Sequence, residues 1–116
     1  MTEDDKFKAL VLIDFWQEKF PVAFPEKPAP KVPLRINIGQ AGGLLYKTSI
    51  AVGAAAKDVA NALYLWCRGK RYWQSFKTNE YRFGLYGKAA QRVTAEDVAY
   101  AKHKLKTWIF EEGGVA

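Results

Sequence analysis

Residues 54–73 read AAAKDVANALYLWCRGKRYW, and this stretch decides more of the fold than any other. Alanines are dense in its first half and apolar residues recur at helical spacing. It therefore predicts a helix over residues 54–68, with Gly69 as the C-terminal cap. The side chains expected to face inward are Val59, Ala62, Leu63 and Trp66. Three cations in four positions follow, at Arg68, Lys70 and Arg71, and aromatic residues continue to Phe76.

A first helix is expected upstream, over residues 4–20, because Asp4 and Asp5 suit a helix start and Pro21 ends it. Its apolar residues at helical spacing, interrupted by Asp14, are Phe7, Leu10, Val11 and Phe15, and the surface is widened by Leu12, Ile13 and Trp16. A helix with so wide an apolar surface is expected to pack on more than one neighbour.

Five prolines then exclude helix from residues 21–33. This segment is predicted to be an extended arm packed through Phe20 and Phe24, with Lys27 and Lys31 pointing outward. Residues 34–38 alternate apolar and polar, so Leu34, Ile36 and Ile38 are expected to be buried and Arg35 exposed. Three glycines make any helix over residues 40–50 weak and bent.

The last third of the chain predicts a hairpin and a helix. Residues 81–85 alternate, residues 86–88 suit a turn, and residues 91–93 suit a returning strand. Thr94 and Asp97 fit a capping box that begins a helix running to about Phe110, before Gly113-Gly114. Its expected core side chains are Val98, Ala101, Leu105, Trp108 and Ile109. The predicted fold class is mainly α (α+β), a compact helical domain with a small β-hairpin.

The 116 residues suit one domain, with its core over about residues 7–110. No run approaches the roughly 20 apolar residues of a membrane helix. The acidic residues 1–5 do not resemble the start of a signal peptide. Cys67 is the only cysteine, which fits a reducing compartment. These features predict a cytoplasmic protein that does not associate with membranes.

The net charge of +6 is concentrated in the middle of the chain. Residues 31–92 hold eleven Lys and Arg against only Asp58 and Glu80. A positive charge distributed in this way attracts a polyanion, either nucleic acid or an anionic membrane surface. The alternative is a solvated basic surface with no ligand.

Residues for catalysis or metal binding are sparse. His103 is the only histidine, flanked by two lysines, and with Cys67 it cannot assemble a zinc site. Cys67 is better explained as a small core residue than as a reactive thiol. The glycines at 39, 42 and 43 match no phosphate-loop or dinucleotide fingerprint. We therefore expect no enzyme activity, no cofactor and no metal.

The remaining signal is basic residues interleaved with aromatic ones. Lys and Arg neutralise phosphates, and an exposed Tyr stacks on unpaired bases. Trp73, Phe76 and Phe83 are expected to lie in the core, whereas Tyr72 follows the cation cluster and suits either core or ligand. Two alternatives remain open at this point: a helical domain that binds double-stranded DNA, and a protein-interaction adaptor.

Four blocks in a fixed order resemble the ProQ/FinO family of bacterial RNA chaperones. The first is a helix ending in Phe-Pro with a nearby Phe (residues 15–24), and the second is the segment Pro33 to Ile38. The third runs from Ala62–Trp66 through Arg71-Tyr72 to Tyr81–Gly87, and the fourth is Val93-Thr94 with Ala101 and Leu105, at the start of the last helix. The resemblance covers roughly residues 7–110. It implies an RNA-binding protein in post-transcriptional regulation that recognises terminator hairpins with single-stranded U-rich 3′ tails on small regulatory RNAs and mRNAs. We also expect a monomer.

The resemblance also suggests which residues contact RNA. Tyr72 and Arg82 match a family pocket, where the phenol would stack on or hydrogen-bond to a terminal nucleotide and the guanidinium would bind its phosphate. Ala60 and Tyr64 depart from the family by standing where members carry arginines. The full predicted set is Tyr72, Arg82, Arg71, Lys70, Arg68, Arg35, Lys57, Lys88 and Lys102.

Overall fold

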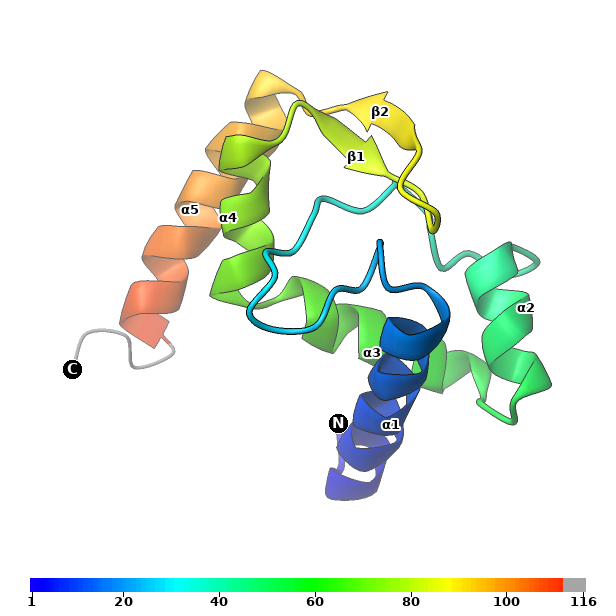
Figure 1. Cartoon of the computed structure of the whole chain (residues 1–116). Helices are drawn as coiled ribbons and strands as arrows, with labels where there is room; N and C mark the ends of the chain where they lie inside the picture. Colours follow the sequence, from blue (N-terminus) through cyan, green and yellow to red (C-terminus); the bar gives the residue numbers. More distant parts are fainter. Residues whose placement is uncertain (112–116) are drawn as a thin grey trace.

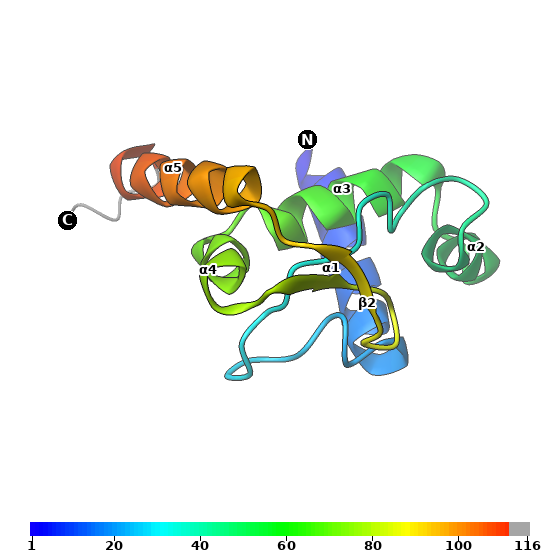
Figure 2. The ribbon, with the colours of Figure 1, turned by 90° about the horizontal axis from the view of Figure 1, so that it is seen from above.

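The structure is a computed structural model that describes residues 1–111, with side chains described for residues 1–107. Within that range lie five helices and one antiparallel two-stranded sheet: α1 (Glu3–Lys19), α2 (Leu44–Ala51), α3 (Ala56–Cys67), α4 (Lys70–Thr78), β1 (Tyr81–Phe83), β2 (Ala89–Arg92) and α5 (Ala95–Glu111). α1 packs against α3, α4 packs along α5, and the hairpin lies above the extended arm (Figures 1 and 2). The predicted mainly helical α+β fold is confirmed.

α1 begins at a capping box in which Thr2 and Asp5 exchange hydrogen bonds, each of 3.1 Å. Its buried face consists of Ala9, Leu12, Ile13 and Trp16. Three of the apolar residues noted at helical spacing, Phe7, Leu10 and Val11, are exposed and do not belong to this face. α1 meets α3 and the arm through the neighbouring face, so Phe7 and Val11 instead line an open hollow of about 510 Å³.

Aromatic side chains lock the arm to the helices, as predicted. Phe20 and Phe24 are buried. The Phe24 ring lies 4.9 Å from that of Trp16 on α1 and 5.2 Å from that of Trp66 on α3. The Trp16 indole N–H donates to the Ser49 hydroxyl at 2.9 Å, which ties α2 to the same core. The path of the arm is therefore fixed on both sides.

The segment after the arm is less regular than its alternating sequence suggests. Leu34 forms a single parallel bridge with Phe83 and is buried, but Ile36 is 49% exposed, contrary to expectation. The backbone turns at Asn37, whose φ of 63° ends the extended conformation. α2 is short and begins at Leu44, after Gly43 as N-cap.

Gly69 is the N-cap of α4, and Arg68 occupies the C-cap of α3, so the predicted role of Gly69 is wrong. α4 was not predicted as a separate helix. Its buried residues, Tyr72, Ser75 and Phe76, follow helical spacing, but the cations and aromatics around them hide that periodicity.

The predicted hairpin is confirmed, although its first strand ends earlier than expected, at Phe83, and its second begins earlier, at Ala89. The register is irregular between Tyr81 and Phe83. The capping box at the start of α5 is also confirmed: the Asp97 carboxylate accepts from Thr94 N–H at 2.9 Å, and Asp97 N–H donates to the Thr94 hydroxyl at 3.1 Å. Ala101 is buried, whereas Val98 and Leu105 are half-buried. The side chains of Trp108 and Ile109, and residues 113–114, lie outside the described parts.

Candidate nucleic-acid interface

Tyr72 and Arg82 meet at the backbone of Leu34. The Leu34 N–H donates to the Tyr72 hydroxyl oxygen at 3.2 Å. The Leu34 carbonyl oxygen accepts from Arg82 Nη1 at 3.1 Å. α4 supplies the tyrosine and β1 the arginine, so two residues that are ten positions apart and belong to different elements hold one peptide segment. The two side chains converge as predicted, on a backbone segment of the protein itself.

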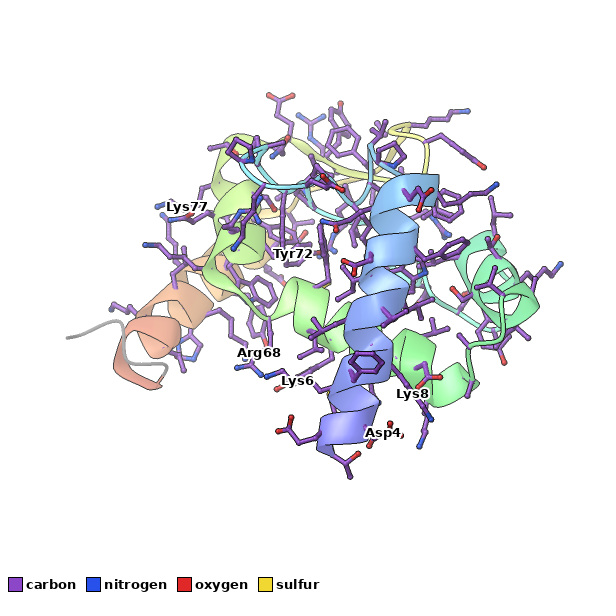
Figure 3. The ribbon with its side chains drawn as sticks, turned by 60° about the horizontal axis from the view of Figure 1, so that its bottom comes forward. Asp4, Lys6, Lys8, Arg68, Tyr72 and Lys77 are labelled. Carbon is purple, nitrogen blue, oxygen red and sulfur yellow. The ribbon has the colours of Figure 1, made fainter. Side chains whose placement is uncertain are left out.

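The Tyr72 ring lies in the core, which is one of the two locations that the sequence left open for it. The residue is only 4% exposed, and its ring lies 5.4 Å from those of both Trp73 and Phe76. Figure 3 shows it in the interior, whereas Lys77 of the same helix points outward. Burial raises the pKa of the Tyr72 phenol well above its usual range. The hydroxyl is therefore a neutral group that positions Leu34.

The Arg82 guanidinium is bound mainly by protein groups. Its Nη2 lies 3.1 Å from Asp97 Oδ1, and the guanidinium carbon lies 4.8 Å from the centre of the Phe76 ring. The side chain is 17% exposed. Hydrogen bonding from the Thr94 backbone and then from Arg82 lowers the pKa of Asp97, so this carboxylate stays charged opposite the arginine.

A second group of cations gathers where the arm crosses the junction of α3 and α4. The Lys31 ammonium donates to the Trp66 carbonyl oxygen at 2.8 Å and lies 3.9 Å from the centre of the Trp66 ring. Arg71 donates from Nη2 to the Ala29 carbonyl oxygen. The expectation that Lys31 points away from the protein is wrong, because the helix end and the indole face both attract its charge.

No carboxylate forms an ion pair with Lys31 or Arg71 among the described residues. Burial, and next the charge of Arg71, lowers the pKa of Lys31 to about 8. The two cations are therefore held close together by backbone contacts, and no carboxylate of the described residues neutralises their charges. We call Lys31, Arg68, Lys70 and Arg71 the corner cluster.

Tyr64 adds an exposed aromatic ring beside the corner cluster. It is 59% exposed, and the Arg68 guanidinium carbon lies 5.6 Å from its ring centre. Sequence reasoning noted Tyr64 only as a departure from the family pattern and did not select Lys31 as a site residue. Tyr64 could have been selected from the sequence, because it lies one helical turn before Arg68 and the two side chains therefore share one face of the helix.

The other predicted RNA contacts are spread over the molecule. Lys57 lies at the opposite end of α3 from Arg68, roughly 16 Å along the helix axis, and pairs with Asp5 at 3.1 Å. Lys88 is exposed in the hairpin turn, Lys102 is exposed on α5, and Arg35 is half-buried beside β1.

The part of the chain that the structure describes contains no group of three or more His, Cys, Asp or Glu residues able to hold a metal. Burial raises the pKa of Cys67 to about 11, so its thiol is a weak nucleophile. His103 is exposed on α5.

None of the described helices is both long and apolar enough to cross a membrane.

The family model described as the ProQ/FINO family matches residues 7–111. A FinO-like RNA chaperone from Neisseria meningitidis shares 21% identity with this chain at a TM-score of 0.69, and the match covers 95% of this chain and 84% of the Neisseria chain. A ProQ homolog from Legionella pneumophila shares 26% identity at a TM-score of 0.69, covering 85% of this chain and 81% of its own. The first likeness supports the fold alone. No curated protein sequence gives a match.

Proposed function

Because this chain belongs to the ProQ/FinO family, we propose that it is an RNA-binding protein of the RNA-chaperone type and that it does not act as an enzyme. The observation that carries this proposal is the corner cluster. Lys31 of the arm and Arg71 of α4 line the same hollow, and Arg68 and Lys70 are the neighbours of Arg71 in the sequence at the α3–α4 junction. Lys31 and Arg71 have no carboxylate partner in the described residues. Such a group neutralises the phosphates of a folded nucleic acid.

The exposed ring of Tyr64 supports single-stranded RNA as part of the ligand. It lies next to the cations rather than in the core, so it is able to stack on an unpaired base while Arg68 and Lys70 contact the backbone. Tyr72 and Arg82 take an indirect role in this proposal. They hold Leu34, and through it they position Arg35 and the end of the arm.

The proposed ligand is an intrinsic-terminator hairpin with a U-rich 3′ tail, as found on small regulatory RNAs and mRNAs. The stem would lie on Arg68, Lys70 and Arg71, with Arg35, Lys57, Lys88 and Lys102 as outer contacts, and the tail would reach Tyr64. A hairpin with a free 3′ hydroxyl after several uridines should bind best. Moving the tail to the 5′ side, or blocking its end with a 3′ phosphate, should weaken binding.

Competition binding tests the class of ligand. A labelled tailed hairpin should be displaced by the same unlabelled RNA, but poorly by duplex DNA of equal length. A plot of the logarithm of the binding constant against the logarithm of the salt concentration should have a negative slope of several units, because several phosphates are neutralised. Equal displacement by the duplex DNA would favour the DNA-binding alternative, and a flat salt dependence would contradict nucleic-acid binding altogether.

Single charge removals test the surface. Arg68→Gln and Lys70→Gln should each weaken binding by about tenfold, on hairpins of any stem sequence alike, because phosphate contacts carry no sequence information. Lys19→Gln is the matched control, since Lys19 is an exposed cation at the end of α1. An equal loss in the control would mean that total charge, and not the corner cluster, governs affinity.

A further inference from the structure

A hollow of about 320 Å³ lies between the proline-rich arm and α4. Lys31 and Arg71 line it, together with the exposed amide of Gln74, and no Asp or Glu of the described residues does so. Pro28 and Pro30 form part of the wall, so the arm side has a restrained backbone. We call this space the arm–α4 hollow.

We infer that the arm–α4 hollow binds a single phosphate group, held between the Lys31 ammonium and the Arg71 guanidinium. The first argument is a count of donors. A lysine ammonium has three N–H groups. One donates to the Trp66 carbonyl oxygen, and the Trp66 ring face, 3.9 Å from Nζ, accommodates another. At least one N–H of Lys31 has no acceptor among the described residues.

Arg71 repeats this pattern. It has five N–H groups in a planar fork, and its one hydrogen bond in the described structure goes from Nη2 to the Ala29 carbonyl oxygen. The rest of the fork is available to the oxygens of a phosphate, which it matches in geometry. The Gln74 amide supplies further donors from the adjacent turn of α4.

The positions of both cations are fixed before any ligand arrives. Lys31 is anchored to the end of α3 and Arg71 to the arm, so binding an anion there requires little ordering of the side chains. Their mutual repulsion, together with the burial of Lys31, is relieved by an anion placed between them. Glu26 and Lys27 line the adjoining hollow with the same two cations, but Glu26 forms no ion pair with either.

The phosphate could come from two sources, the backbone of a bound RNA or a small phosphorylated molecule. The RNA source rests on the proposed function, whereas binding of free phosphate does not. The first experiment therefore uses inorganic phosphate and the intact chain, followed by amide chemical shifts in NMR spectra. Saturable shifts at Lys31, Arg71 and Gln74 in the millimolar range support the inference, and shifts that do not saturate overturn it.

Gln74→Glu is the sharpest variant, because it places a carboxylate beside the two cations at an exposed helix position where folding is not at risk. Lys77→Gln is its matched control: it also lowers the net charge by one on α4, but Lys77 does not line the hollow. We expect Gln74→Glu and Lys31→Gln to weaken phosphate binding by at least about tenfold, and Lys77→Gln to change it less than about twofold. Equal weakening by Gln74→Glu and Lys77→Gln would overturn the inference.

A third measurement identifies the source. Tailed hairpin RNA is added to the phosphate-saturated protein, and the phosphate-induced shifts are followed. Displacement of phosphate, with weaker RNA binding in Gln74→Glu, assigns the hollow to the RNA backbone. Retention of phosphate alongside RNA assigns it to a small phosphorylated ligand. If the protein fails to bind RNA at all, the phosphate titration still decides whether the hollow is an anion site.

Discussion

Arg82 and Arg71 make the same kind of contact in two regions of the molecule, with different consequences. Each reaches from its own element to a backbone carbonyl of the chain between α1 and α2, Arg82 to Leu34 and Arg71 to Ala29. Arg82 also meets the carboxylate of Asp97 and is mostly buried. Arg71 meets Lys31 and no carboxylate in the described part of the chain. A neutralised arginine stabilises the fold, whereas one beside another cation leaves a positive field for a ligand.

Removing each arginine should separate these two roles most strongly. Arg82→Ala leaves Asp97 partly buried without its partner and the Leu34 carbonyl without its donor. We expect it to lower the free energy of unfolding by about 3 kcal/mol. Arg71→Ala should lower the same quantity by less than about 1 kcal/mol, because the Ala29 carbonyl lies on an exposed part of the arm.

Urea unfolding followed by tryptophan fluorescence measures both free energies. The RNA affinity of the two variants is compared without urea, at a temperature at which both are folded. Arg71→Ala should then show the larger loss of RNA binding. The comparison fails if Arg71→Ala unfolds as readily as Arg82→Ala, or if only Arg82→Ala binds RNA more weakly.

The tyrosines provide a second, smaller contrast. Tyr72→Phe removes the hydroxyl that accepts from Leu34 N–H, so a buried donor loses its partner. We expect a loss of about 1–2 kcal/mol in the free energy of unfolding.

Tyr64 should behave differently, because its ring is exposed. Tyr64→Phe should leave the free energy of unfolding within about 0.5 kcal/mol of the parent. Tyr64→Ala should weaken binding to the tailed hairpin but not to an untailed one. Thermal unfolding and fluorescence anisotropy measure these effects, and an unchanged stability of Tyr72→Phe would show that the hydroxyl does not hold Leu34.

Much of the fold was predictable from local signals. The non-helical, proline-rich arm, the hairpin and the Thr94–Asp97 capping box each depend on residues within a few positions of one another, and all three are found. The arm is not extended throughout as predicted, because residues 21–24 and 27–29 form turns. The burial of α1 was not predictable in the same way. Two apolar faces compete on that helix, and only the placement of α3 and the arm decides that Leu12 and Trp16, not Phe7 and Val11, are covered.

The candidate site divides along the same line. The cations of the α3–α4 junction are adjacent in sequence, so the cluster was visible there. The environment of Lys31 was not, because its partners Trp66 and Arg71 lie 35 and 40 positions further along the chain. The location of Tyr72 was left open for the same reason: the cations beside it are local in the sequence, but Leu34, whose N–H donates to the Tyr72 hydroxyl, lies 38 positions earlier.

The smallest predicted effect concerns Lys31 and tests its lack of neutralisation directly. Its pKa is lowered from the ordinary value of 10.5 to about 8 in the folded protein, first by burial and then by Arg71. Between these two values the unfolded chain binds more protons than the folded one, so the free energy of unfolding should rise with pH. Above about pH 9 the raised pKa values of Cys67 and then Tyr72 act in the opposite direction. The effect of Lys31 is therefore isolated by subtracting the free energy of unfolding of Lys31→Met from that of the parent between about pH 7.5 and 9. Solvent screening should keep the effect below about 1 kcal/mol.

Two changes should make this rise of the free energy of unfolding with pH smaller. Arg71→Gln removes the neighbouring charge, and saturating phosphate stabilises the ammonium form of Lys31. A parent and a Lys31→Met variant with parallel stability curves over this window would mean that the charge of Lys31 is already compensated, and the contrast between the two arginines would lose its basis.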